Sequence, residues 1–425
     1  MTIAEDNRER IVAYFESGSK EQDQKLGVEV EHFIVADDGT PFTYEPQGSL
    51  PGLRDVLTHL LKTYPVIFRN TRGELIGCAN EEASVTLEPA AQIEVSIAPF
   101  ASVGEVVAAY EHFCSALEPY LSEQGAKLVN AGYHPTRKAE ELTLIPKERY
   151  RLMDEYFSDL GTLGLRMMRA SASTQVSIDY SDEADAVRKM RIASALAPIL
   201  GAIADNVTVY EREEGTYSLV RLAVWRNVDN ARCGVIPGVF KPDFGFASYA
   251  DWLLGTSPIF INVEQSDGTS VEQAEFSRSA AEIYADTPMT KADIEHLISM
   301  FWPDVRLKRF VEIRPADSLP LKYLEGYVAL IKGLFYSEKS LVTLEHELGV
   351  QKDINGQDRW PLDEQAIEDA IEAIRTQGFE ARFYGDEPKS LRKWEELLFS
   401  LARTSLSYDE QHYLDNIEQF ALSKH

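Results

Sequence analysis

Pairs of carboxylates, or a carboxylate with an arginine, occur in short segments whose apolar and polar residues alternate. In residues 27–34, the period of two of a β-strand places Glu29 and Glu31 on one face and valines on the other. Two carboxylates one pleat apart repel each other, so a buried face holds them only when a cation neutralises their charge. Related patterns carry further polar side chains, namely Glu88 with Glu94, Gln175 with Asp179, and Glu312 with Arg314.

Four such strands side by side would line a cavity with oxygen atoms. Hard divalent cations take oxygen ligands and bridge substrate phosphates, so the expected chemistry is that of a multi-magnesium phosphate site. Taken singly, each acid is as well explained by a solvated strand face, and Glu312 with Arg314 by a surface ion pair. The metal-site hypothesis depends on the acids occurring together, because every one of them lies opposite an apolar face in a segment rich in Val, Ile and Leu.

Arginines near these segments allow two interpretations. Arg149, followed by Tyr150, and Arg221 could form salt bridges in an acidic protein, or could bind carboxylates and phosphates through paired hydrogen bonds. The sequence contains no Walker or G-x-G-x-x-G loop and no G-x-S-x-G motif. A phosphate substrate would therefore have to be held by metals and arginines, and a Ser/His/Asp hydrolase is disfavoured.

The composition limits the class of protein. The chain has 425 residues, 44% of them hydrophobic, which is enough for a large core. Its 69 acidic and 42 basic residues give a net charge of −27, which argues against nucleic acid or an anionic membrane as a partner. No membrane span or signal peptide is expected, and the three widely spaced cysteines favour a reducing compartment, the cytoplasm.

The spacing of apolar residues predicts the elements that position these side chains. Helices are expected over residues 4–18, 101–124 and 182–206, and the chain is expected to be mostly helical from about residue 338. The acid-bearing strands are spread from residue 29 to residue 312. We therefore predict one α+β catalytic domain, with a core over about 20–335, a largely antiparallel sheet, and a helical C-terminal region over about 336–425.

Several ordered segments resemble the plant and proteobacterial type of glutamate–cysteine ligase. The resemblance extends from about residue 25 to 315, and the matching segments are 84–96, 146–153, 164–169, 174–180, 181–189, 221–225 and 244–249. Membership of this family implies the glutamine synthetase superfamily fold, a curved antiparallel sheet that lines an acidic funnel. It also implies ATP as co-substrate and two or three magnesium ions.

The resemblance further implies roles for individual residues. Glu31, Glu88 and Glu94 would surround one magnesium ion, while Glu29 and Glu312 would hold a second. Gln175 stands where the superfamily often has a histidine, and Arg314 would face the transferred phosphate. The candidates for binding the glutamate carboxylates are Arg149, Tyr150 and Arg221.

The predicted function is ATP-dependent ligation of L-glutamate to L-cysteine through γ-glutamyl phosphate. Two alternatives remain open at this stage: a γ-glutamyl ligase that uses another amine, and a non-catalytic regulator that binds glutamate or nucleotide. The chain has Ala90-Ala91 where the family usually has Gly-Gly or Gly-Ala, and this departure bears on the amine acceptor rather than on the metal chemistry.

Overall fold

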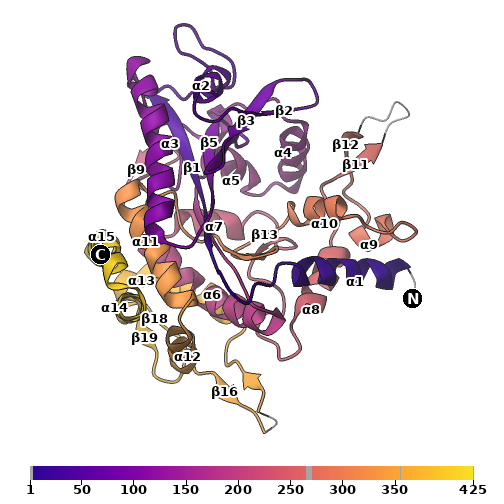
Figure 1. Cartoon of the computed structure of the whole chain (residues 1–425), viewed down its shortest axis with the longest axis vertical. Helices are drawn as coiled ribbons and strands as arrows, with labels where there is room; N and C mark the ends of the chain where they lie inside the picture. Colours follow the sequence, from indigo (N-terminus) through magenta and orange to yellow (C-terminus); the bar gives the residue numbers. More distant parts are fainter. Residues whose placement is uncertain (1–2, 265–269, 355, 425) are drawn as a thin grey trace.

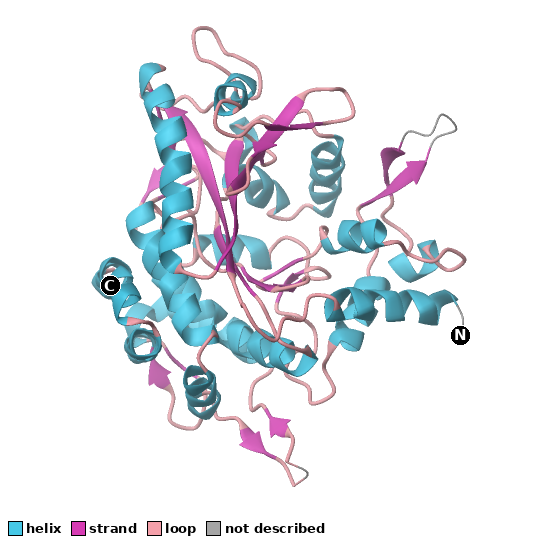
Figure 2. Cartoon of the chain, in the orientation of Figure 1, coloured by secondary structure: helices cyan, strands magenta, loops and turns pink. Residues whose placement is uncertain are grey.

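The computed structural model describes residues 3–264, 270–354 and 356–424. It has an α+β fold in which one large sheet runs through the molecule and helices cover it (Figures 1 and 2). Within the described ranges, no helix is long and apolar enough to cross a membrane.

The central sheet has nine strands in the order β14-β15-β7-β1-β5-β4-β3-β2, with β6 also paired to β1. All of its pairs are antiparallel, which confirms the predicted fold class. The strands are β1 (Leu26–Ala36), β2 (Val66–Arg69), β3 (Leu75–Ala79), β4 (Ala83–Leu87), β5 (Gln92–Phe100), β6 (Ala126–Val129), β7 (Thr174–Ile178), β14 (Val305–Leu307) and β15 (Val311–Ile313).

The register of the sheet brings the acid-bearing segments together. Glu31 of β1 pairs with Glu94 of β5, and Glu29 pairs with Gln175 of β7 on the other side of the strand. One strand further on, Glu312 of β15 pairs with a residue of β7. Since side chains alternate along a strand, these polar groups all share one face, while Val28 and Val30 are buried on the other.

Helices pack on both faces of the sheet. α3 and α11 lie along the face opposite the acids, where they contact β5 and β1, and α6 contacts β14 and β15 (Figure 1). The helices are α1 (Ile3–Glu16), α2 (Leu53–Leu60), α3 (Val103–Glu123), α4 (Glu148–Leu160), α5 (Gly164–Ala170), α6 (Glu183–Ile203), α7 (Val220–Arg226), α8 (Phe246–Gly255), α9 (Ala280–Ile283), α10 (Lys291–Ile298), α11 (Leu321–Phe335), α12 (Glu338–Glu347), α13 (Glu364–Gln377), α14 (Leu391–Ser405) and α15 (Leu414–Ser423).

The predicted helices are confirmed, and their ends follow capping chemistry. Asp182 caps α6 by accepting a hydrogen bond from the Asp185 N–H, and Ser102 with Glu105 forms a capping box at the start of α3. The predicted C-terminal helices correspond to α12–α15. A single cluster of buried apolar side chains extends from Ile11 of α1 to Ala421 of α15.

Short two-stranded sheets lie outside the central sheet. Pairing is antiparallel in β8–β9, β11–β12, β16–β17 and β18–β19, and parallel in β10–β13. Their strands are β8 (Val209–Tyr210), β9 (Glu213–Glu214), β10 (Cys233–Gly234), β11 (Phe260–Glu264), β12 (Ser270–Ala274), β13 (Trp302–Pro303), β16 (Gln351–Lys352), β17 (Asp358–Arg359), β18 (Arg382–Phe383) and β19 (Lys389–Ser390).

Ala91, in the turn between β4 and β5, has a φ of +74°, a conformation that favours glycine. We expect Ala91→Gly to raise the free energy of unfolding by up to about 1 kcal/mol, because relief of backbone strain exceeds the entropy that glycine adds to the unfolded chain. Ala90→Gly is the matched control and should lower stability, since Ala90 is not among the residues with positive φ. Thermal melting measures both, and a lower midpoint for Ala91→Gly would contradict the expectation.

Candidate active site

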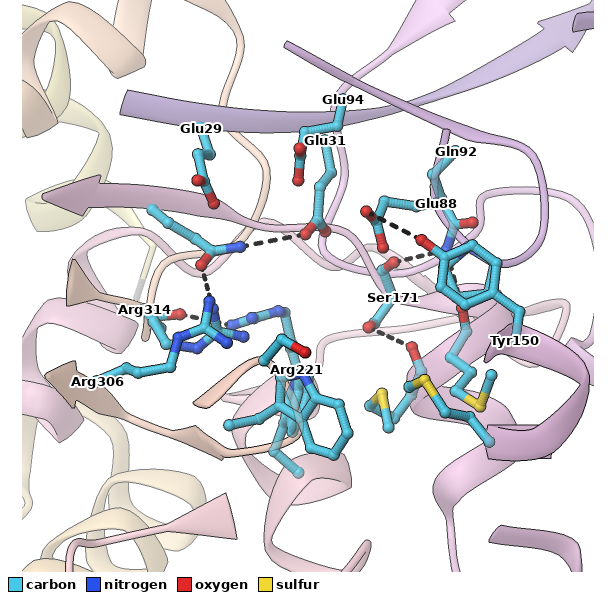
Figure 3. Close-up of a pocket in the computed structure, with 18 of the residues that line it drawn as sticks. Glu29, Glu31, Glu88, Gln92, Glu94, Tyr150, Ser171, Arg221, Arg306 and Arg314 are labelled. Atoms are coloured by element: carbon cyan, nitrogen blue, oxygen red, sulfur yellow. Dashed lines mark hydrogen bonds between the residues drawn. The ribbon is translucent and has the colours of Figure 1, made fainter. Parts of the chain in front are cut away.

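A cavity of about 230 Å³ opens on the acidic face of the sheet and collects most of the predicted site residues (Figure 3). Nine of the ten predicted residues line it, namely Glu29, Glu31, Glu88, Glu94, Arg149, Tyr150, Gln175, Arg221 and Arg314. The tenth, Glu312, does not. The remaining lining residues are Pro89, Gln92, Met153, Met167, Met168, Ser171, Trp225, Ser299, Trp302 and Arg306.

The walls of the cavity come from distant parts of the chain. The sheet supplies Glu29, Glu31, Glu94 and Gln175, and Glu88 directly follows β4. α4 supplies Arg149 and Tyr150. α7 supplies Arg221, and Arg314 directly follows β15. Segments that are widely separated in sequence therefore contribute to one site, as the sequence spacing predicted.

Glu29, Glu31 and Glu94, which face the cavity, are destabilised in their charged form. Burial, followed by repulsion from Glu88, raises the pKa of Glu31 to about 7. Burial and repulsion from Glu29, Glu88 and Glu31 raise the pKa of Glu94 well above its usual range. Burial also raises the pKa of Glu29. At Glu29 and Glu31, burial and repulsion together outweigh the attraction of the neighbouring basic side chains.

The donor set fits a divalent cation by its chemistry. The acids are oxygen donors in a buried cavity, and a bound cation would offset both the burial and the mutual repulsion. As they stand, however, no three His, Cys, Asp or Glu side chains of the described residues form a group arranged to hold an ion. The carboxylates share one cavity without converging on one point.

Neighbouring polar groups fix the orientation of individual carboxylates. Glu94 accepts hydrogen bonds from the hydroxyls of Thr86 (3.1 Å) and Ser96 (3.0 Å). Glu31 accepts one from the backbone N–H of Ser173 (2.7 Å) and one from the Gln175 amide (3.2 Å).

The Gln175 amide connects the acids to the arginines. Its oxygen accepts a hydrogen bond from Arg314, while its nitrogen donates to Glu31. Gln175 is 4% exposed, so this orientation is set by buried partners on both sides. An amide serves this position because it presents a donor and an acceptor at once.

Glu312 is fully buried and binds three basic side chains. It accepts hydrogen bonds from Arg306 (2.6 Å), Lys308 (2.6 Å) and Arg314 (3.0 Å). Burial alone would raise the pKa of Glu312, but the three cations outweigh it and hold the pKa well below its usual range. Here Glu312 organises cations, and its predicted role as a magnesium ligand stays a prediction.

Arg306 and Lys308 were missed in the sequence, although a signal for them exists. Residues 305–308 alternate apolar and basic side chains, and in the β14–β15 hairpin Arg306 lies directly opposite Glu312. Opposite charges on paired strand positions stabilise each other, so the hairpin pattern itself indicated the pair.

Two arginines and a tryptophan bring buried donors to the cavity walls. The Nε atoms of Arg149 and Arg221 and the indole N–H of Trp225 are buried without a hydrogen-bond partner in the described structure. Arg221 also donates to the backbone oxygen of Arg314 (2.9 Å), and Trp225 lies 5.8 Å and 5.7 Å from the guanidinium groups of Arg221 and Arg314. Unpaired buried donors of this kind suit an anionic ligand.

Tyr150 connects the arginine-bearing helix to the acidic strand. Its hydroxyl donates to the backbone oxygen of Leu87 (3.2 Å) and lies 3.4 Å from the Glu88 carboxylate. Lys147 donates to the same Leu87 oxygen (2.7 Å), so the end of β4 is fixed by two side chains from the start of α4.

Comparison with known proteins finds relatives among the chloroplastic glutamate–cysteine ligases of plants. The chain is 31% identical over 341 residues to glutamate–cysteine ligase B, chloroplastic, of rice, which covers 79% of this chain and 68% of the rice protein. It is 30% identical over 341 residues to the chloroplastic glutamate–cysteine ligase of Arabidopsis thaliana, covering 79% and 64% of the two chains.

Similarity of fold extends further than similarity of sequence. A glutamate–cysteine ligase from Francisella tularensis, solved in complex with AMP, superimposes with a TM-score of 0.53 at 10% identity over 95% of this chain and 83% of that one. The sequence pattern of glutamate–cysteine ligase family 2 (GCS2) matches residues 25–419. The chain therefore belongs to glutamate–cysteine ligase family 2.

Proposed function

We propose that this protein is an ATP-dependent carboxylate–amine ligase that joins the γ-carboxylate of L-glutamate to L-cysteine and forms γ-glutamylcysteine. One observation carries the proposal: buried carboxylates and unpaired arginine donors line a single cavity in a chain of this family. The relatives are named glutamate–cysteine ligases, and a protein of similar fold binds AMP.

The reaction needs an activated carboxylate, because a free carboxylate has no leaving group. The γ-carboxylate oxygen attacks the γ-phosphorus of ATP, which breaks the bond to ADP and forms γ-glutamyl phosphate. The amine of cysteine then attacks the acyl carbon, loses a proton and displaces inorganic phosphate. The enzyme forms no covalent bond, which agrees with the absence of a nucleophile motif from the sequence.

Magnesium is part of the proposal through the acids that would hold it. Glu29, Glu31, Glu88 and Glu94 are the candidate ligands. When bound there, Mg²⁺ would supply positive charge that stabilises the transferred phosphate. Glu312 stays a candidate second ligand of the Glu29 ion, although its oxygens accept hydrogen bonds from basic side chains in this structure.

The arginines divide into two proposed groups. Arg314 is held by Glu312 and Gln175 and presents its charge to the same end of the cavity as Arg306, which suits binding of the transferred phosphate. Arg149 and Arg221 have unpaired Nε–H groups and are assigned to the carboxylates of glutamate. The buried walls would exclude water, which would otherwise hydrolyse the acyl phosphate.

The order of steps provides the direct test of this function. With ATP, Mg²⁺ and glutamate but no amine, hydroxylamine should trap the γ-glutamyl group as a hydroxamate, and untrapped intermediate should cyclise to 5-oxoproline. Adding cysteine should divert the same flux to γ-glutamylcysteine, which mass spectrometry identifies. A protein that binds glutamate or ATP but gives neither ADP nor hydroxamate with any amine would not be a ligase.

The raised pKa values of the acids predict opposite effects of pH and Mg²⁺ on stability. The pKa of Glu31 is about 7 in the folded protein against an ordinary 4.5, so the folded state binds this proton more tightly and stability falls as the pH rises between those values. At pH 8, Mg²⁺ at a hundredfold excess over its Kd should raise the free energy of unfolding by about 2–3 kcal/mol. At pH 5 the same excess should raise it by less.

Melting curves of two variants complete that test. Glu94→Gln should reduce the Mg²⁺-dependent rise in the melting midpoint, whereas Glu82→Gln, at an exposed position outside the cavity, should retain it. Burial also raises the pKa values of Asp317 and Glu395, which lie outside the cavity. These two acids should therefore contribute only to the part of the pH dependence of stability that Mg²⁺ leaves unchanged. A melting midpoint that does not change with Mg²⁺ at pH 8 would contradict the proposed metal site.

Arg314→Lys tests the phosphate role of the arginine. A single ammonium cannot reproduce the planar fork that contacts Glu312, Gln175 and the cavity together, so kcat should fall by about a hundredfold or more while ATP still binds. Arg10→Lys on the exposed side of α1 serves as the control. An unchanged kcat with a higher KM for glutamate would instead assign Arg314 to substrate positioning.

A further inference from the structure

Polar side chains lie behind the acid-bearing strands, on the face of the sheet that α3 covers. His32 follows Glu31 in β1, and the antiparallel register places it opposite Ile93, the residue before Glu94. Because side chains alternate along a strand, the His32 ring lies on the other side of the sheet from the two carboxylates. The ring is fully buried, so polar partners have to satisfy both of its nitrogens.

The hydrogen bonds of His32 allow one arrangement of its protons. Nδ1 lies 3.2 Å from the backbone oxygen of Ile93, and Nε2 lies 2.7 Å from the hydroxyl of Tyr110 in α3. A carbonyl oxygen only accepts, so Nδ1 carries a proton and donates it to the Ile93 oxygen. Both partners of this buried ring are neutral, so the ring is neutral as well. Nε2 is therefore an acceptor, and the Tyr110 hydroxyl donates to it.

Asn130, which directly follows β6, connects Tyr110 to Ser318. Its side-chain amide donates to the Tyr110 hydroxyl (3.4 Å) and to the Ser318 hydroxyl (3.0 Å). Ser318 is fully buried and in turn donates to the backbone oxygen of Glu31 (2.5 Å). Each of these side chains thus donates to one neighbour in a consistent order. We call the four residues His32, Tyr110, Asn130 and Ser318 the back-face network.

Both ends of the back-face network are backbone oxygens beside a carboxylate of the cavity. One is the oxygen of Glu31 itself, and the other belongs to the peptide unit that joins Ile93 to Glu94. Glu31 and Glu94 pair across β1 and β5, so the network binds both strands directly behind this pair. Ser173 holds Glu31 as well, because its N–H donates to the Glu31 carboxylate and its backbone oxygen accepts from the Glu31 N–H (3.0 Å).

Asn206 joins two members of the network through their backbones. Its side-chain amide donates to the backbone oxygens of Asn130 (3.1 Å) and Ser318 (2.8 Å). Asn130 follows β6 and Ser318 follows β15, so this amide ties together segments that are far apart in sequence. Removing one side chain of the network would leave its neighbour with an unpaired buried group, which costs more than the hydrogen bond contributes when it is made.

We propose that the back-face network positions the Glu31–Glu94 pair for cation binding. It fixes the backbones of both strands from behind, so two carboxylates that repel each other stay side by side before an ion arrives. Tyr110 and Ser318 are positioning residues in this sense, since neither lines the cavity. The cation, Mg²⁺, rests on the function proposed above, whereas the hold on the two strands does not.

Ser318→Ala tests the end of the network that contacts Glu31, since alanine removes the hydroxyl and adds no bulk. Mn²⁺ takes the same oxygen ligands as Mg²⁺ and can be titrated by electron paramagnetic resonance. Its Kd should rise by about tenfold, as for other partners that orient metal ligands.

Ser340→Ala is the matched control for this variant. Ser340 is also fully buried, and its hydroxyl donates to the backbone oxygen of Gly333 (2.9 Å), away from the sheet. The control should lower the melting midpoint as Ser318→Ala does, because each loses one buried hydrogen bond. Its Kd for Mn²⁺ should stay within about twofold of that of the parent protein, since the site is remote.

Tyr110→Phe tests the end that reaches Ile93 through His32. Phenylalanine keeps the ring stacked on His32 and removes the proton that Nε2 accepts, so the Kd for Mn²⁺ should again rise by about tenfold. Tyr44→Phe is the control, since the buried Tyr44 hydroxyl also donates to a backbone oxygen, that of Leu75 (2.9 Å) in β3. It should leave the Kd unchanged. Should one of the two network variants fail to fold, the other decides alone.

Hydrogen exchange without metal separates this inference from the proposed function. In EDTA, Ser318→Ala and Tyr110→Phe should accelerate exchange of residues 28–33 and 92–96 more than exchange elsewhere in the sheet, whereas the controls should not. If the parent protein binds no Mn²⁺, the metal site of the proposed function fails, yet this exchange still decides whether the network holds the strands. In a parent that binds Mn²⁺, network variants that only melt earlier and keep the parental Kd would overturn the proposal.

Discussion

Electrostatic repulsion among buried carboxylates is the constraint on which the rest of the site depends. The antiparallel register places Glu31 opposite Glu94 and leaves Glu29 one pleat away, so like charges are held close together on a buried face. Burial and repulsion raise the pKa of all three. The acids on such a face can be charged only if other groups supply positive charge. In ATP-dependent ligases, the cations that bind with the nucleotide supply such charge.

The protein supplies part of that charge itself, and it does so from outside the row of acids. Glu312 binds Arg306, Lys308 and Arg314 at one end of the cavity. Gln175 accepts a hydrogen bond from Arg314 and donates one to Glu31, so it connects the basic side chains to the acids. Arg221 comes from α7 and donates to the backbone oxygen of Arg314 (2.9 Å). Each cation is fixed by a buried partner, so the positive groups are in place before a ligand binds, as electrostatic preorganisation requires.

A turn with unusual backbone geometry lies between β4 and the acid-bearing strand β5. Ala91 occupies a left-handed conformation beside the acid-bearing strand, where glycine would be relaxed. The turn nevertheless holds its shape, because the Gln92 side chain accepts from the Ala90 N–H and donates to the backbone oxygens of Met168 and Ser171. Strain in the turn is thus offset by hydrogen bonds to the last turn of α5 and to the residue that follows this helix.

The sequence by itself predicted the acid-bearing strands, their polar face and ten site residues, nine of which line the cavity, because a period of two is visible locally and the resemblance to the family singles out particular acids. It also predicted the long helices α3 and α6 from their spacing and caps. Only the tertiary structure decided that Glu312 binds three cations and that Arg306 joins the cavity. Those contacts depend on strand register and on the packing of helices far apart in the chain, which no local pattern encodes.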